Sequence, residues 1–189
     1  MEELDQIITL YINSLHCGFT DYIWMFFSNR DVWFPFYLIV LIFLIKNLGW
    51  KKGGIVALSL VLMVLATDQF ANLIKNSVCR YRPSHNEWML QNGLHLLEDA
   101  GSMYGFYSAH AANSFGFAVA SLMGFRNDKS RSYKGYAWGV YVWASLVAVS
   151  RIFAGKHFLG DVLAGTVAGL LFGFFFGFIA RKVIASLES

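Results

Sequence analysis

Five long apolar segments constrain the fold of this chain more than any other feature. They cover residues 32–46, 53–75, 108–125, 135–150 and 158–180. A helix needs roughly 20 apolar residues, with a range of about 17–25, to cross a bilayer, and the first and fourth segments are short by this measure. Only 14% of the residues are charged, against about 25% in an average soluble domain. The sequence therefore predicts an all-α integral membrane helical bundle, with about five transmembrane helices in a single domain over residues 1–189.

Residues 1–31 precede these segments and form a different kind of region. Between residues 2 and 16, apolar residues recur at helical spacing: Leu4, Ile7, Ile8, Tyr11, Ile12 and Leu15. The other face is acidic and polar: Glu2, Glu3, Asp5, Gln6, Thr9 and Asn13. A second helix, rich in aromatic residues, is expected over 19–28. We predict that both are amphipathic helices lying at the membrane interface, because His16 and Asp21 disfavour one span over 7–27. The first ten residues also lack the basic and apolar regions of a signal peptide.

Basic residues are distributed so as to define an orientation. Those of the two loops after the first and third spans, and of the C-terminal tail, are Lys46, Lys51, Lys52, Arg126, Lys129, Arg131, Lys134, Arg181 and Lys182. The N-terminal 31 residues contain five acids and one arginine. Because basic loops stay in the cytoplasm, we expect the N-terminus outside and the C-terminus inside. Loop 76–107 and junction 150–157 would then lie outside.

The remaining composition excludes some functions. The net charge of +3 is small and the cations lie in loops and short motifs, so no nucleic-acid partner is expected. No obligate protein partner is predicted either. Cys17 and Cys79 form no disulfide framework, although a single disulfide between them stays open.

The last apolar segment carries a glycine at every fourth position, namely Gly165, Gly169, Gly173 and Gly177. Such spacing places all four on one helix face, where a neighbouring helix can approach closely. Glycine is also common in membrane helices in general, but the regular spacing favours packing.

Polar residues gather at the predicted outer ends of four spans. Lys75, Arg82 and Arg151 supply three cations, two of them planar guanidinium groups that suit phosphate oxygens. His157 and Asp161 are four residues apart and so share a helix face, which lets a carboxylate hold one imidazole nitrogen and leave the other free as a base or nucleophile.

His110 offers a second acid or base, and Ser108 begins its helix, where unpaired N–H groups attract anions. Together these residues predict a phosphoryl-transfer site. The acids are too few and too scattered for a Mg²⁺ cage, so neither a metal nor another cofactor is expected. Taken singly, each histidine could have a purely structural role, and Lys75 and Arg82 could simply anchor helices at the lipid headgroups.

Other polar residues allow two interpretations. Asp68 lies seven residues before Lys75, on the same helix face, and with Gln69 and Asn72 either supports the site or forms a structural hydrogen bond between helices. Four residues of the outer loop either touch a headgroup or belong to a solvated loop, which is the more common case: His85, His95, Glu98 and Asp99. Lys156 is expected to aid substrate docking.

Three motifs carry a resemblance to a known family. They are KNSVCRYRP (75–83, the form K-x6-R-P), YSAH (107–110) and SRIFAGKHFLGD (150–161, the form S-R-x5-H-x3-D). In this order they resemble the phosphatidic acid phosphatase type 2 (PAP2) family, which shares its site with vanadium haloperoxidases and glucose-6-phosphatase. The resemblance covers residues 65–161, and the last span completes the bundle. Tyr107 and Ala109 depart from the family's P-S-G-H, which alters the turn before the helix.

The resemblance implies roles for the site residues. His157 would attack phosphorus to form a phosphohistidine, Asp161 would orient it, and His110 would protonate the leaving oxygen. The phosphate would be held by Lys75, Arg82, Ser108 and Arg151.

The chain would then be a metal-independent lipid phosphatase of a bacterial cytoplasmic (inner) membrane, with its site on the outer side. Its substrate would be undecaprenyl diphosphate, lipid A phosphate, phosphatidylglycerol phosphate or phosphatidic acid. The alternatives are an anion or lipid transporter, which has no need of paired histidines, and a relative of the vanadate-dependent haloperoxidases, which are usually larger soluble chains.

Overall fold

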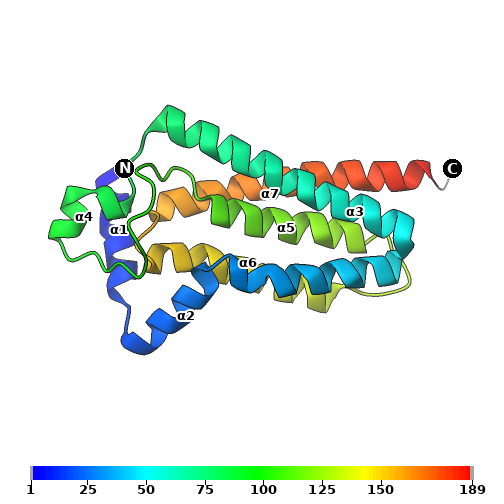
Figure 1. Ribbon diagram of the computed structural model, residues 1–189, viewed down its shortest axis with the longest axis horizontal. Helices are drawn as coiled ribbons and strands as arrows, with labels where there is room; N and C mark the ends of the chain where they lie inside the picture. Colours follow the sequence, from blue (N-terminus) through cyan, green and yellow to red (C-terminus); the bar gives the residue numbers. More distant parts are fainter. Residues whose placement is uncertain (1, 188–189) are drawn as a thin grey trace.

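The computed structural model describes residues 2–187, which form helices and loops with a single isolated β-bridge, Tyr81–Tyr104, and no strand. The α-helices are α1 (Glu2–Ser14), α2 (Gly18–Ser28), α3 (Phe34–Val78), α4 (Glu87–Gln91), α5 (Ala109–Phe125), α6 (Lys134–Phe153) and α7 (Leu159–Ser186). Two short 3₁₀ turns are η1 (Asp31–Trp33) and η2 (Pro83–His85). The long helices run side by side in one bundle (Figure 1). The prediction of an all-α membrane bundle is confirmed.

The first two predicted spans are the two arms of α3. At Gly49 the backbone leaves the helical region, with φ 76° and ψ 168°, and the chain turns back on itself (Figure 1). A Cβ atom on Gly53 would lie 2.9 Å from the Cα atom of Ile45. The missing side chain therefore lets the arms pack closely beside the turn.

The helix bounds correct several predicted ends. Among the described residues α3, α6 and α7 are long and apolar enough to cross a membrane, whereas α5 has 17 residues and is enclosed by contacts with α3, α6 and α7. The helix α6 continues past residue 150 to Phe153, so Arg151 lies inside its last turn. The helix α7 continues past residue 180 to Ser186.

The glycine face of α7 packs against α5, as the spacing predicts. A Cβ atom on Gly165 would lie 2.4 Å from the carbonyl oxygen of Ser108, and one on Gly169 would lie 2.2 Å from that of Ala112. Both distances are shorter than van der Waals contact, so only glycine allows this separation of the two backbones. The close packing fixes the start of α5 against the first turns of α7.

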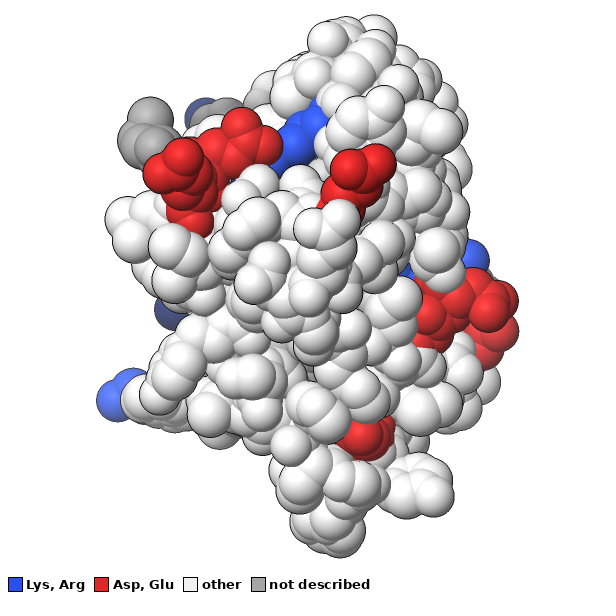
Figure 2. Space-filling view, turned by 90° about the vertical axis from the view of Figure 1, so that its left-hand side faces the viewer, with Lys and Arg blue, Asp and Glu red and all other residues white. Residues whose placement is uncertain are grey.

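The helices α1, α2 and α4 gather at one end of the bundle, opposite the C-terminus (Figure 1). The helix α1 exposes its apolar side chains Leu4, Ile7 and Tyr11, while Thr9 and Asn13 of its polar face are buried against the bundle. Asn13 donates from Nδ2 to the carbonyl oxygen of Ile152 at 3.1 Å. The polar face of α1 is thus its protein-facing side, which the amphipathic pattern alone did not reveal. Figure 2 looks onto this end and shows acidic side chains in separate groups.

Candidate active site

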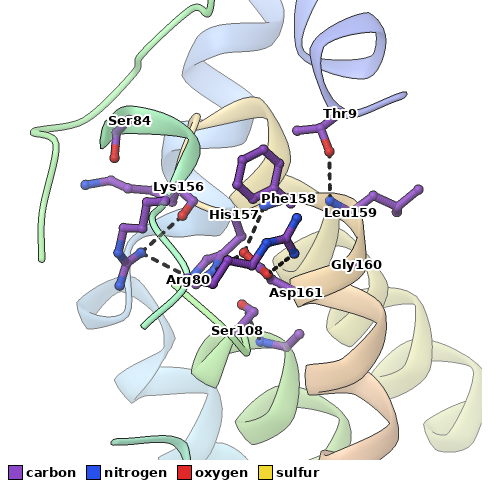
Figure 3. Close-up of polar contacts among 12 residues, drawn as sticks. Thr9, Arg80, Ser84, Ser108, Lys156, His157, Phe158, Leu159, Gly160 and Asp161 are labelled. Carbon is purple, nitrogen blue, oxygen red and sulfur yellow. Dashed lines mark hydrogen bonds and ion pairs between the residues drawn. The ribbon is translucent and has the colours of Figure 1, made fainter. Parts of the chain in front are cut away.

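Predicted site residues from segments far apart in the chain meet at this end, where Figure 3 shows Ser108 beside His157 and Asp161. A helix-ending turn after α6 brings His157 back to the bundle. Gly155 has a φ of 69°, and the N–H groups of Gly155 and Lys156 donate to the carbonyl oxygens of Ile152 and Arg151, both at 3.0 Å. This is the Schellman arrangement, in which glycine takes the left-handed position. The turn holds His157 beside the end of α6 that carries Arg151.

His157 and Asp161 form a buried pair at the start of α7. His157 is 2% exposed and Asp161 0%, and His157 Nδ1 lies 3.4 Å from Asp161 Oδ2. The same Oδ2 atom accepts a hydrogen bond from the N–H of Phe158 at 3.1 Å, which fixes the carboxylate. On the other side of the ring, His157 Nε2 lies 3.2 Å from Arg82 Nη1.

The surroundings of His157 favour the neutral imidazole. Burial lowers its pKa well below the usual 6.5, and the charges of Arg82, Arg151 and Lys75 lower it further. A proton on Nδ1, toward Asp161, leaves the Nε2 lone pair facing Arg82. The nitrogen that faces Arg82 is therefore the one with a free lone pair.

An extended segment presents two arginines to the site. The N–H of Arg82 donates to the carbonyl oxygen of Met103 at 3.0 Å, and the N–H of Gly105 donates to the carbonyl oxygen of Arg80 at 2.9 Å. Because side chains alternate along an extended chain, Arg80 and Arg82 point the same way, while Tyr81 is 51% exposed. Arg82 also donates to the carbonyl oxygen of Lys156 at 3.2 Å.

Arg80 was not predicted as a site residue, although it contacts the pair directly. Its Nη1 donates to Asp161 Oδ1 at 2.7 Å, and its guanidinium lies 4.2 Å from the centre of the Phe158 ring. The K-x6-R-P motif could have indicated Arg80, because side chains alternate along an extended segment and residues 80 and 82 then lie on the same side as each other.

Glu98 of the outer loop binds two site cations. Its Oε1 lies 3.3 Å from Arg151 Nη1 and its Oε2 lies 3.6 Å from Lys156 Nζ. Ser28 of α2 donates to Glu98 and accepts from Arg151. Burial opposes ionisation of Glu98, but Arg151, Ser28 and Lys156 outweigh it and lower its pKa. The interpretation of Glu98 as a solvated loop residue was wrong, because its carboxylate neutralises buried cations.

A cleft of about 400 Å³ opens onto these groups. It is lined by residues of α2, of the following loop, of the outer loop and of the site: Met25, Ser28, Asn29, Arg30, Asp31, Glu98, His110 and Arg151. The cleft therefore joins His110 and Arg151 to the surface. Arg30 and Asp31 at its rim were not predicted.

The other predicted residues are placed as follows. Lys75 lies in the last turn of α3, within electrostatic range of Arg82 and Asp161. Ser108 is fully buried, caps α5 and donates from its N–H to the carbonyl oxygen of Asp161 at 3.0 Å. Asp68 accepts from Asn113 Nδ2 at 2.7 Å, which is the structural hydrogen bond between α3 and α5.

The remaining candidates are exposed or contact residues beside the site. Asn72 is exposed on α3. His85 contacts Ser84, and Asp99 accepts from Lys156 through its carbonyl oxygen. Cys17 and Cys79 are free and exposed.

His95, His16 and Asp21 form a separate cluster. His95 Nε2 lies 3.1 Å from Asp21 Oδ2 and His16 Nδ1 lies 3.7 Å from it. The two imidazole rings stack with centroids 3.6 Å apart and planes within 5°. An ion shared by both rings would have to lie near both ring planes, which parallel stacked rings do not allow. We interpret the cluster as a contact between the α1–α2 turn and the outer loop.

A buried imidazole–carboxylate pair, surrounded by cations at one end of a membrane bundle, defines a membrane enzyme that acts on phosphate groups. The chain matches the model of the PAP2 superfamily over residues 56–183, most of its length, and belongs to that superfamily. It is a phosphatase that hydrolyses lipid phosphates in a membrane.

Two relatives agree with this assignment, and one solved structure has a similar fold. The chain is 31% identical to the lipid A 4'-phosphatase of Bacteroides thetaiotaomicron, over 100% of this chain and 82% of that protein. It is 28% identical to the lipid A 4'-phosphatase of Porphyromonas gingivalis, over 92% and 71%. Its fold is similar to the PAP2-type phosphatidylglycerolphosphate phosphatase of Bacillus subtilis, with a TM-score of 0.75, 20% identity and coverage of 96% and 87%.

Proposed function

We propose that the chain removes a phosphate monoester from a lipid A-type glycolipid, through a phosphohistidine at His157. One observation carries the mechanism: buried His157 has Asp161 at Nδ1 and a cation at Nε2, and a cleft reaches the neighbouring residues His110 and Arg151 from the surface. An imidazole held in this way is an oriented nucleophile. Cations placed around the transferring phosphoryl group stabilise its transition state.

The reaction has two steps. The Nε2 lone pair attacks phosphorus, the bond between phosphorus and the lipid oxygen breaks, and His110 donates a proton to that oxygen. Water then attacks the phosphohistidine and gives a proton to His110, which releases phosphate and restores His157. Lys75, Arg82, Ser108 and Arg151 hold the phosphate oxygens, and Asp161 stabilises the positive charge that His157 carries between the steps.

The choice of lipid rests on the two relatives. Both are lipid A 4'-phosphatases, and they match nearly the whole of this chain. The cleft also has polar rim residues, Asn29, Arg30 and Asp31, which suit the hydroxyl and phosphate groups of a glycolipid. The basic segments at the opposite end of the bundle support a site on the outer face of a bacterial inner membrane.

Phosphate release from purified lipids tests the proposal. The panel contains lipid A, undecaprenyl diphosphate, phosphatidylglycerol phosphate and phosphatidic acid, each with EDTA present. We expect the fastest turnover on lipid A, and a loss of roughly 1,000-fold or more in His157→Ala and His110→Ala. His85→Ala replaces an imidazole of the outer loop and serves as the control. Near-wild-type turnover in His157→Ala would refute the mechanism, and faster turnover of another lipid would refute the substrate.

Rapid quenching at alkaline pH tests the intermediate. Lipid carrying radiolabelled phosphate should leave label on the wild-type protein and none on His157→Ala. Turnover without labelled wild-type protein, under conditions that preserve a phosphohistidine standard, would contradict a covalent step.

A further inference from the structure

Arg80 connects the His157–Asp161 pair to the N-terminal helix, and Figure 3 shows Arg80 beside Asp161. Its Nη1 donates to Asp161 Oδ1 and its Nη2 donates to Asp5 Oδ2, each at 2.7 Å. Both carboxylates are largely buried, with side-chain exposures of 0% for Asp161 and 16% for Asp5. The guanidinium thus bridges two acids that lie 156 positions apart in the chain.

The same face of α1 also accepts hydrogen bonds from the first turn of α7. The N–H of Leu159 donates to Thr9 Oγ1 and the N–H of Gly160 donates to Asp5 Oδ1, each at 2.9 Å. The first N–H groups of a helix have no partner within the helix, and here α1 supplies partners for two of them. The turn that carries Asp161 is therefore held by Asp5 both directly and through Arg80.

The charge on Arg80 matters for the state of His157. A carboxylate with no exposure needs a compensating cation. If Arg80 were absent, the nearest group able to provide that charge would be His157, which would gain a proton at the nitrogen lone pair needed for attack. The Arg80 charge therefore favours an ionised Asp161 beside a neutral His157.

We propose that Arg80 is a positioning residue for the His157–Asp161 pair and that Asp5 holds Arg80 in place, so that α1 belongs to the active-site machinery. This inference rests on the proposed function, in which a neutral His157 is the nucleophile. A role for α1 in membrane anchoring alone requires only its exposed apolar face. Membrane anchoring alone leaves unexplained why the Asp5 side chain of α1 points into the protein and binds Arg80, which in turn binds Asp161.

Kinetics and a titration test the inference together. The variants are Arg80→Gln, Arg80→Lys, Asp5→Asn and the double variant Arg80→Gln/Asp5→Asn. Glu3→Gln removes an exposed acid from the same helix and is the matched control. For each protein we would measure kcat and KM across pH, the thermal midpoint, and the titration of His157 by NMR of histidine-labelled protein, with His157→Ala identifying its resonance.

We expect Arg80→Gln to lower kcat about 10- to 100-fold with little change in KM, and to raise the pKa of His157. Arg80→Lys should recover part of the loss. The other charged groups around the pair, Arg82, Lys75, Arg151 and His110, are the same in every variant. A shift in the titration therefore reports on Arg80.

Asp5→Asn should change kcat and the titration in the same direction by a smaller factor. The double variant should resemble Arg80→Gln, because residues that act through one another are not additive. Fully additive losses would show that Asp5 does not act through Arg80.

An unchanged kcat and titration in Arg80→Gln, even with a lower thermal midpoint, would overturn the inference by leaving Arg80 a purely structural role. Failure of the proposed function is a separate result. The wild-type protein would then release no phosphate from any lipid of the panel, while the NMR titration would still show whether Arg80 controls His157.

Discussion

The Nε2 atom of His157 lies 3.2 Å from Nη1 of Arg82, on the side of the ring opposite Asp161. The imidazole therefore lies between a carboxylate and a guanidinium. Arg82 donates to the same nitrogen that would attack phosphorus. An incoming phosphate oxygen would take over that donor and release the lone pair.

The acid limb of the pH–rate profile should lie below pH 6.5. Burial and three cations lower the pKa of His157, so the imidazole is still neutral at pH 6.5 and gains its proton only at lower pH. Arg82→Gln removes one of these cations, which raises the pKa of His157 and moves the acid limb to higher pH. The measurement is kcat against pH for both proteins on one lipid, since the substrate phosphate itself titrates near pH 6. If the acid limb of Arg82→Gln stays in place or moves to lower pH, its assignment to His157 is contradicted.

Glu98→Gln should strengthen inhibition by inorganic phosphate. In the free protein the Glu98 carboxylate contacts Arg151 and Lys156, so a bound anion must compete with it. Removing this charge should lower the inhibition constant several-fold, an effect on the order of 1 kcal/mol. Glu87→Gln, an exposed acid of the same loop, should leave the constant unchanged. Weaker inhibition in Glu98→Gln would show instead that Glu98 prepares Arg151 for phosphate.

Gly169→Ala should destabilise the bundle. The added Cβ atom would lie 2.2 Å from the carbonyl oxygen of Ala112, so α5 and α7 would have to move apart at a typical cost of about 1–3 kcal/mol. Gly54→Ala adds a Cβ atom with nothing within 4 Å and is the matched control. The readout is the thermal midpoint in one detergent, and equal midpoints for the two variants would rule out the close packing.

A membrane-impermeant maleimide should label the wild-type protein from outside the cell. Cys17 and Cys79 are free and exposed, and both flank helices at the site end of the bundle. In a Cys17→Ser/Cys79→Ser background, Ser130→Cys in the loop between α5 and α6 should react only after permeabilisation. Labelling of residue 130 in intact cells would reverse the proposed orientation.

Much of the fold could be predicted because its signals are local. Each apolar segment specifies a helix by itself, and the fourfold glycine spacing of α7 marks a packing face without knowledge of its partner. His157 and Asp161 are likewise one helical turn apart, so their proximity follows from the helix period. The helix ends were less accurate, since α6 and α7 continue beyond the purely apolar residues.

The contacts that the sequence did not reveal join residues distant in the chain. Glu98 lies in an irregular loop with no periodicity to indicate where its side chain points, and only the folded bundle brings it to Arg151. Arg80 reaches Asp5 and Asp161 because an extended segment, the first helix and the last helix meet at one end. By itself the sequence determined a membrane bundle and predicted a phosphate-binding motif set. The tertiary structure decided which charges neutralise one another there, because a buried charge takes its partner from whatever element the fold places beside it.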